Sequence, residues 1–407
     1  MKLEFNRTMR LAAGSAAALL LLGSGAAIAQ KAPEKIKIGY AVSLTGPFAG
    51  PSAMLPVANY RLWAKEVNAK GGLKVAGFDN RIPIEVIEYD DTSNPENAIR
   101  LTEKLMVDDK VDFVLPPWGT AMNLAVAPVY KKNNYPQLGA TAVINNAEAM
   151  TKRFDTLFLF STNASDYATG IVDMLAKLKA EGKINNKVVL LSVADQFGAD
   201  LNAAGSKAFK DAGFDVVLNK TYPMASRDLS TEMKQAQDSG ADSFVAFSYP
   251  GDTFMIAAQA QTLGYNPKVY YTAVGTAFPG FKAKLGDKAQ GILGAGGWDR
   301  SAPGAQGYFD AFKAMTNNEP DRWGSPITYA SAQTLEQAIE KVGLDRKKVI
   351  EHLRTGTFDT IAGKLKFTNQ VQREQPVVSQ WQGGDFVIVQ PANLPGAKPA
   401  ILPKPTW

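Results

Sequence analysis

The sequence contains no cysteine and only one histidine, His352, in 407 residues. Without cysteine the chain has no disulfide, no thiolate nucleophile and no thiolate metal ligand, so core burial has to hold the fold together. One histidine leaves almost no material for a Ser-His-Asp triad or a histidine-rich metal site. His352 lies in the helix-like segment KKVIEHLRTG, where a solvated position at a helix end is favoured over a general base. We therefore expect no catalytic residue, no metal site, no cofactor and no enzyme activity.

A large excess of charge of one sign is also missing. The chain carries 44 Lys and Arg against 39 Asp and Glu, a formal net charge of +5. Loss of the first 29 residues, with three basic side chains and one acidic one, lowers this charge to +3. So mild a basic excess gives no reason to expect a nucleic-acid partner.

Long hydrophobic runs are limited to one, from Leu11 to Leu22, which is too short to span a hydrocarbon core of about 30 Å. Lys2, Arg7 and Arg10 precede this run, and it is followed by the small-residue sequence AIA that ends at Ala29. This order of charge, apolar run and small residues predicts a secretory signal peptide that is cleaved after Ala29. The mature protein is therefore expected to be exported.

From Ile36 onward, short β-branched or aromatic runs alternate with longer amphipathic stretches, as in parallel strands joined by helical crossovers. The first group of strands is expected at Ile36–Val42, Ile82–Tyr89 and Val111–Leu115, with helices at Ala53–Ala69, Pro95–Val107 and Met122–Lys132. The second group of strands is expected at Leu157–Phe160, Val188–Val193, Val216–Tyr222, Ser243–Phe247 and Val269–Tyr271, with helices at Tyr167–Ala180, Gly198–Asp211, Leu229–Asp238 and Phe254–Leu263. Two successive units of similar size predict two α/β lobes, each with a doubly wound, three-layer (α/β/α) sheet.

The last third of the chain begins with two expected helices, Pro326–Val342 and Lys347–Leu353, and continues with the extended segments GKLKFTNQ, PVVSQWQ and DFVIVQ. Strands after helices indicate that the chain crosses back between the lobes to complete a sheet. Residues 391–407 are rich in proline and have no periodicity, so we expect a partly ordered surface tail.

In a doubly wound sheet, ligands bind at the carboxyl ends of the strands, where loops lead into helices. The candidate ligand contacts in three such loops of the first unit, SLTGPFAGPSAM, PPWGTAMN and LGATAVIN, are Phe48, Trp118, Gly119, Thr120, Ala140, Thr141 and Ala142. A helix that opens at Gly119 and Thr120 would offer a carboxylate free N–H groups and a hydroxyl. Thr120 as a simple N-cap is the alternative.

The matching loops of the second unit place aromatic residues at the same mouth. These candidates are Tyr167, Phe197 and Tyr249, and Thr272 lies in the TAVGTAF loop. Single aromatic residues are usually core residues, and that alternative stays open for each ring. Asp90 and Asp91 also follow a strand, but two acids without further ligands are better explained by loop or helix-cap roles.

Five segments together resemble one known family, the periplasmic leucine/isoleucine/valine-binding proteins of ABC transporters, which have the type I periplasmic binding protein fold. They are IKIGYAVSLTGPFAG, NAKGGL, IEVIEYDDTSNPENAIR, QLGATAV and TYASAQTLEQAI. The resemblance implies two lobes that close on a ligand by a hinge motion, without a chemical step. It places three crossovers near Ser161, Gly297 and Gly363. The implied N-terminal lobe is 30–160 plus 298–362, and the C-terminal lobe is 161–297 plus 363–390.

The resemblance also implies roles for individual residues. Thr120, Ala140 and either Thr141 or Ala142 would fix a ligand carboxylate, and Phe197 and Tyr249 would be aromatic contacts. The family's disulfide is missing, since Ser93 and the Gly119 region stand in place of its cysteines, so we expect packing to hold that loop.

One departure bears on the ligand. Where amino-acid binders carry an acid for the ligand ammonium, this chain has Thr272 or Ala273. A buried ammonium without a carboxylate is costly, so we expect an aromatic or other hydrophobic acid that lacks an α-ammonium. If Asp166 supplies the missing charge, the ligand is a branched-chain or other hydrophobic amino acid. The resemblance implies a membrane permease as the partner and the periplasm as the location. A monomer is the oligomeric state expected by default. A receptor for a separate sensor protein is the remaining alternative.

Overall fold

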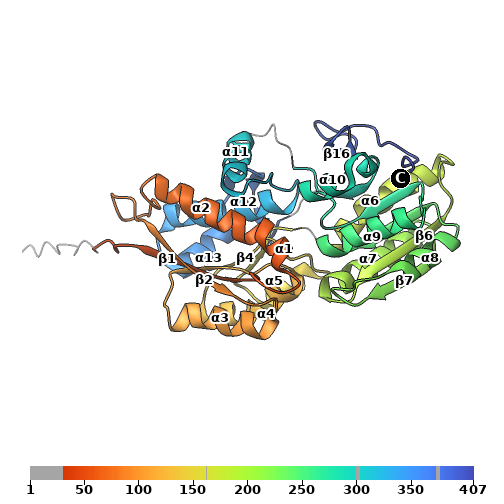
Figure 1. Ribbon diagram of the computed structural model, residues 1–407. Helices are drawn as coiled ribbons and strands as arrows, with labels where there is room; N and C mark the ends of the chain where they lie inside the picture. Colours follow the sequence, from red (N-terminus) through yellow and green to blue (C-terminus); the bar gives the residue numbers. More distant parts are fainter. Residues whose placement is uncertain (1–30, 162, 299–302, 373–375) are drawn as a thin grey trace, which may run out of the picture. The chain divides into compact units, whose positions relative to one another are not determined.

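The computed structural model describes residues 31–161, 163–298, 303–372 and 376–407 (Figure 1). The predicted signal peptide, residues 1–29, lies outside the described residues. From Pro33 to Trp407 the chain packs as one compact unit that contains two main groups of parallel strands. The α/β class that the sequence predicts is therefore confirmed.

The first group of strands lies between two layers of helices, with α2 and α12 on one side and α3 and α4 on the other (Figure 1). Its sheets have the orders β2-β1-β3 and β13-β14-β5-β4. β1 is buried along almost its whole length and pairs in parallel with both β2 and β3, as expected for a nearly continuous apolar run. The elements of this part up to the second sheet are β1 (Ile36–Val42), α1 (Ala49–Ser52), a π-helix (Ala53–Val57), α2 (Ala58–Ala69), β2 (Ile84–Asp90), α3 (Pro95–Val107), β3 (Phe113–Leu115), α4 (Thr120–Asn133), β4 (Gln137–Gly139), α5 (Ala147–Arg153) and β5 (Leu157–Leu159).

The second group is a seven-stranded sheet with the order β16-β15-β10-β9-β8-β6-β7. The central strands are buried end to end, whereas the edge strand β7 is largely exposed and carries polar residues, which is typical of a protected edge. Helix α6 packs against α7, and α8 against α9. The elements are α6 (Ala164–Ala180), β6 (Lys187–Val193), α7 (Gln196–Asp211), β7 (Asp215–Tyr222), α8 (Ser230–Asp238), β8 (Ser243–Phe247), α9 (Pro250–Thr262), β9 (Val269–Thr272), α10 (Pro279–Leu285), a 3₁₀ turn (Gly286–Ala289) and β10 (Leu293–Ala295).

The chain then returns to the first group and crosses once more to the second. The remaining elements are α11 (Ala305–Thr316), α12 (Gly324–Val342), α13 (Arg346–Thr355), β11 (Phe358–Thr360), β12 (Gly363–Leu365), β13 (Phe367–Thr368), β14 (Val371–Gln372), β15 (Val378–Gln382) and β16 (Asp385–Gln390). The chain passes between the two groups after β5, after β10 and between β14 and β15.

The third passage corrects one expectation, that residues from 363 onward belong to the second lobe. β12 pairs with β11, and Val371 of β14 pairs with Leu159 of β5. Strand β5 would otherwise be an edge whose free backbone groups need a partner, and β14 supplies it. We therefore propose a lobe boundary between 372 and 378 in place of 363.

The proline-rich tail, 391–407, contains no helix or strand and is anchored by specific contacts. Lys404 is buried, and its backbone N–H donates to the backbone carbonyl of Lys268 at 2.8 Å. The Trp407 indole donates to the Tyr265 carbonyl at 2.6 Å and packs edge-on to Tyr270. The tail therefore covers one end of the second sheet.

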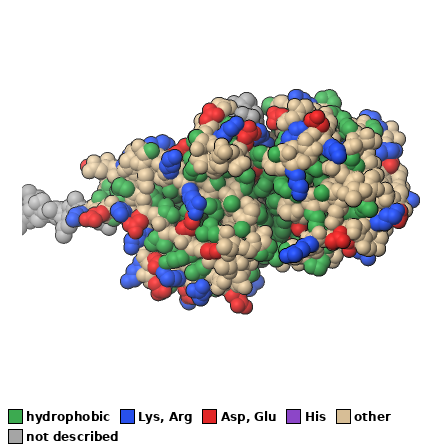
Figure 2. Space-filling view, viewed as in Figure 1, with side chains coloured by type: hydrophobic (Ala, Val, Ile, Leu, Met, Phe, Trp, Pro, Cys, Tyr) green, Lys and Arg blue, Asp and Glu red, His purple; other side chains and the backbone are tan. Residues whose placement is uncertain are grey.

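Acidic and basic side chains are interspersed over the face in Figure 2, and no broad area of one sign is visible there. This distribution agrees with the small net charge of the sequence. Within the described residues, every helix is too short or too polar to cross a membrane.

Candidate functional site

Four of the predicted contacts form one buried aromatic cluster, defined here as Phe48, Trp118, Phe197 and Tyr249. Each ring follows the carboxyl end of a strand, two in the first group and two in the second. Tyr249 stacks on Phe197 with ring centres 4.9 Å apart and lies 4.9 Å from Trp118 and 5.8 Å from Phe48. The cluster therefore joins the two groups of strands, and its rings are at most 6% exposed.

The loop that carries Phe48 is held by hydrogen bonds. The Ser93 hydroxyl accepts from the Phe48 N–H at 3.0 Å and donates to the Thr45 carbonyl at 2.7 Å. The buried carboxylate of Asp91 accepts from Ser43 at 2.6 Å and from the Ser93 N–H at 2.8 Å. We expected packing alone to hold this loop, where Ser93 replaces a cysteine. These hydrogen bonds hold it in addition to packing.

Helix α4 begins in this region, immediately after Trp118. Gly119 is its N-cap, with φ = 91°, a backbone conformation that favours glycine, and its N–H donates to the Thr141 hydroxyl at 2.9 Å. Thr120 is buried, and its hydroxyl donates to the Val143 carbonyl at 3.1 Å and accepts from the Val143 N–H at 3.0 Å. Thr120 is thus not the N-cap, and its hydroxyl ties the two first-lobe loops together. The N–H groups of the first turn have no acceptor inside the helix and remain suited to an anion.

The other predicted contacts lie around this cluster or away from it. The Ala140 carbonyl accepts from the Ser161 hydroxyl at 2.9 Å, whereas Ala142 packs in a separate apolar cluster with Ile144. Thr272 is fully buried at the end of β9, and its hydroxyl lies 2.6 Å from that of Thr276. The Tyr167 ring contacts Trp323, with centres 6.0 Å apart.

Two carboxylates beside the cluster, the half-buried Asp195 and the buried Asp252, were not predicted from the sequence. Asp195 caps α7 by accepting from the Gly198 N–H at 2.9 Å, and it also accepts from the Tyr249 hydroxyl at 2.6 Å. Asp252 lies in the first turn of α9, with Tyr222 as a hydrogen-bond donor at 3.4 Å. Burial raises the pKa of Asp195, and it raises the pKa of Asp252 to about 6. Asp195 lies just before α7 and Asp252 lies in the first turn of α9, and these two positions were the sequence signals that could have identified them.

A cavity of about 400 Å³ lies where the chain passes between the two groups of strands. We call it the crossover cavity. Ser161, Gly297 and Val377, from the three passages, line it together with Tyr167, and of the predicted contacts only Tyr167 does so. Trp298, Arg322 and Trp323 also line it, although the sequence analysis assigned them no role.

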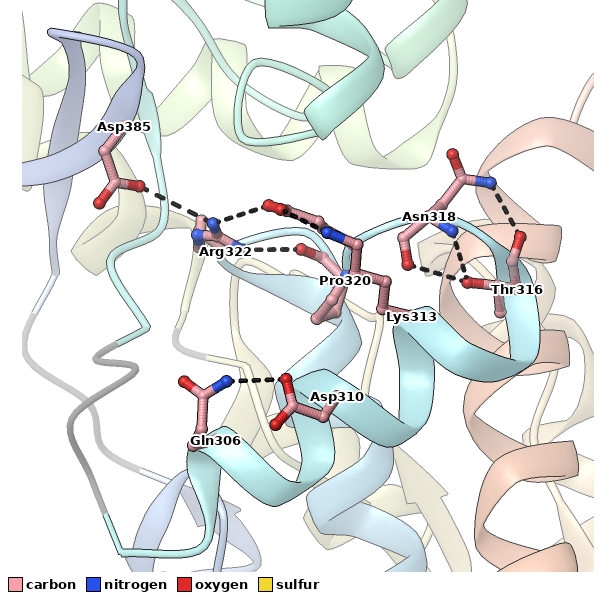
Figure 3. Close-up of polar contacts among 9 residues, drawn as sticks. Gln306, Asp310, Lys313, Thr316, Asn318, Pro320, Arg322 and Asp385 are labelled. Carbon is pink, nitrogen blue, oxygen red and sulfur yellow. Dashed lines mark hydrogen bonds and ion pairs between the residues drawn. The ribbon is translucent and has the colours of Figure 1, made fainter.

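Among the described residues in the wall of this cavity, Arg322 carries a charge. Its guanidinium lies between Glu319, at 3.1 Å, and Asp385, at 3.7 Å, and it donates to the Pro320 carbonyl at 3.1 Å (Figure 3). The Arg322 side chain is only 8% exposed. The contact with Asp385 exceeds hydrogen-bond distance, so this pair is loose.

The side chains of the site are of kinds suited to binding a small molecule. In the described part of the chain, no group of three or more Asp, Glu or His side chains is arranged to hold a metal ion. His352 contacts Phe358 at one end of α13 and belongs neither to the aromatic cluster nor to the wall of the crossover cavity. The arrangement offers aromatic surface, helix N–H groups and two carboxylates, one buried and one half-buried, which are the parts of a recognition site.

Comparisons with known proteins agree with this description. A sequence model of the family described as periplasmic binding protein matches residues 35–384. The Leu/Ile/Val-binding protein homolog 7 of Brucella suis biovar 1 (strain 1330) is 27% identical over 404 residues, which cover 92% of this chain and 96% of the relative.

Two solved structures show the fold. One is LivJ from Streptococcus pneumoniae, a substrate-binding protein of a branched-chain amino acid transporter in complex with isoleucine. It has a TM-score of 0.75 and 21% identity, and the match covers 88% of this chain and 100% of that one. The other is a solute-binding protein of an ABC transporter from Rhodopseudomonas palustris BisB5 in complex with 3,4-dihydroxybenzoic acid. It has the same TM-score and identity, with 88% and 96% covered.

Proposed function

The chain belongs to the periplasmic binding protein family, in the type I arrangement of two α/β lobes, and we propose that it is the solute-binding protein of an ABC transporter of the branched-chain-amino-acid type. It captures a small carboxylate between the lobes in the periplasm and delivers it to a membrane permease without a chemical step. The similarity to transporter-associated binding proteins along most of their length supports this role.

The observation that carries the proposal is the aromatic cluster. Phe48 and Trp118 from one lobe meet Tyr249 from the other at 5.8 and 4.9 Å, close to the first turn of α4. A backbone N–H of Asn145 also donates across to Asp200 at 3.1 Å. In our proposal, hinge opening separates these rings and a bound ligand takes the place of their mutual contact. Apolar surface on both lobes then drives closure over the ligand.

The ligand we propose is an aromatic or other hydrophobic acid without an α-ammonium. Its carboxylate would face the free N–H groups of α4 near Gly119 and Thr120, and its ring would lie among the aromatic side chains. Thr272 and Ala273 offer no charge to an ammonium. The similar R. palustris protein, solved with 3,4-dihydroxybenzoic acid, supports this ligand class.

A hydrophobic amino acid is the second candidate, and the position of Asp195 favours it. The Asp195 carboxylate lies 2.6 Å from the Tyr249 hydroxyl, at the edge of the cluster. An ammonium group that reached Asp195 would gain a half-buried negative partner. The curated relative named as a Leu/Ile/Val-binding protein homolog points the same way.

Isothermal titration calorimetry of the mature protein, residues 30–407, with leucine, benzoate and 3-phenylpropenoic acid separates the two candidates. We expect binding of the aromatic acids, weakened about tenfold or more by Tyr249→Ala because a central ring is lost. Tyr89→Ala is the matched control, since Tyr89 lies on β2 and contacts Lys104 and Asp109 instead of the cluster. Tight binding of leucine alone would refute the proposed ligand class.

A further inference from the structure

The crossover cavity is separate from the aromatic cluster. None of Phe48, Trp118, Phe197 and Tyr249 lines it, and its walls come instead from the three passages of the chain and from the start of α12. Tyr167 lines it on the side of the second lobe and Trp323 on the side of α12. At about 400 Å³ it falls within the range of small-molecule sites.

The walls of this cavity have a definite chemistry. Trp298 donates its indole N–H to the Ile361 carbonyl at 2.9 Å, and the Tyr167 and Trp323 rings meet at 75°. Trp298 and these two rings line the cavity together with aliphatic side chains such as Ile327 and Val377. Such a wall suits a flat, apolar molecule, because aromatic side chains offer both a large apolar area and a preferred geometry for a bound ring.

The charge of the cavity wall favours an anionic ligand over a cationic one. Among the described residues that line it, Arg322 is the one charged side chain, and there is no Asp or Glu. Asp385, at 3.7 Å and itself 59% exposed, is a loose partner that a ligand carboxylate can replace. An ammonium group would face Arg322 without a partner and would be costly to bury.

We propose that the crossover cavity is a second binding site, for a small aromatic monocarboxylate whose ring lies against Trp298 and Trp323 and whose carboxylate pairs with Arg322. The ligand class follows from the walls of the cavity itself and does not depend on the proposed transport role. Because Ser161, Gly297 and Val377 come from three different passages, a bound molecule contacts every connection between the lobes. Occupancy of this site therefore acts on the hinge.

The test is calorimetry of the mature protein with benzoate, scored by the number of binding sites and their association constants. Wild type is expected to show two classes of site. Arg322→Met removes the charge and is expected to weaken one class about tenfold or more, as for a lost charge-assisted hydrogen bond. Arg61→Met is the matched control, because Arg61 pairs with Glu88 on the surface of the first lobe and does not line the cavity.

A second variant keeps the proposal testable if Arg322→Met does not fold. Ala362 lines the cavity, is only partly buried and lies in a turn, so Ala362→Phe adds a ring to the cavity with little other disturbance. It is expected to abolish the same class of site.

A single class of benzoate site whose affinity changes in neither Arg322→Met nor Ala362→Phe would overturn the second site while leaving the proposed transport function intact. Failure of wild type to bind any aromatic acid would overturn the second site and the proposed ligand class together. Loss of a site in Ala362→Phe with no loss in Tyr249→Ala would support the cavity and count against the cluster.

Discussion

Asp252 is a buried acid whose removal is expected to stabilise the protein at neutral pH. The residue is 6% exposed, and its pKa is raised by burial from an ordinary value of 3.8 to about 6. Its side-chain partner, the Tyr222 hydroxyl, lies at 3.4 Å, which is too long for a strong hydrogen bond. The substitution Asp252→Asn keeps the shape of the side chain and removes the charge.

The expected magnitude follows from the two pKa values. Below about pH 4 the carboxyl group is protonated in both the folded and the unfolded protein, so it contributes no pH-dependent difference. Between about pH 4 and 6 the folded state holds the proton more tightly, and the free energy of unfolding falls as pH rises through this window. Above pH 6 the full cost applies, about 3 kcal/mol at most, from 1.36 kcal/mol per pKa unit.

Urea unfolding of wild type and Asp252→Asn, followed by circular dichroism at pH 4 and pH 7.5, measures this cost. We expect the variant to be more stable than wild type by about 1–3 kcal/mol at pH 7.5 and nearly equal to it at pH 4. Asp211→Asn is the control, since Asp211 is exposed and pairs with Lys207 on the surface, and it should change stability by less than about 0.5 kcal/mol. A variant that is less stable at pH 7.5, or a difference that does not change with pH, would refute the reasoning.

Three further changes test other parts of the structure. Ser93→Ala removes the acceptor of the Phe48 N–H and should lower the free energy of unfolding by about 1–2 kcal/mol and weaken ligand binding, both measurable by denaturation and calorimetry. Gly198→Ala places a Cβ 1.8 Å from the Val193 carbonyl oxygen and should lower the free energy of unfolding by about 2 kcal/mol or more. Gly251→Ala, whose Cβ would meet open space, should leave the free energy of unfolding unchanged or raise it by stabilising α9. Equal urea midpoints for the two variants would contradict this expectation. Trp407→Ala removes the anchor of the tail and should lower the unfolding free energy by about 2 kcal/mol, and an unchanged melting temperature would show that the tail does not contribute.

Long elements of the fold could be predicted from the sequence because their local pattern determines them. Strand β1 was predicted with its observed bounds, as were β8 and α3, which has Asn94 as its cap and Pro95 in its first turn. Of the three-residue strands, β3 and β5 lie within expected strands, whereas β4 and β10 were not predicted, because so short a segment has almost no periodicity of its own. The partner of β14 could not be predicted, since pairing with β5 depends on which sheet edge is left open in three dimensions.

In the candidate site too, some features could be predicted from the sequence and others could not. That Phe48 meets Trp118, and that Phe197 meets Tyr249, follows from one rule, that loops at the carboxyl ends of parallel strands of one sheet converge. The rule does not say which polar groups are already used. From the sequence, the Thr120 hydroxyl was expected to be available to a ligand. In the structure it donates a hydrogen bond to the backbone carbonyl of Val143, which lies 23 residues further along the chain. Arg322 and the crossover cavity were invisible for a similar reason, because their walls are brought together only by the three passages of the chain.

The central claim is that the two lobes capture an aromatic acid and release it unchanged. Equilibrium dialysis of the purified mature protein against benzoate, with chromatography of the bound and free fractions after denaturation, tests it most directly. We expect saturable binding and full recovery of intact benzoate from both fractions. Absence of binding under conditions where leucine is retained, or recovery of a converted product, would contradict it.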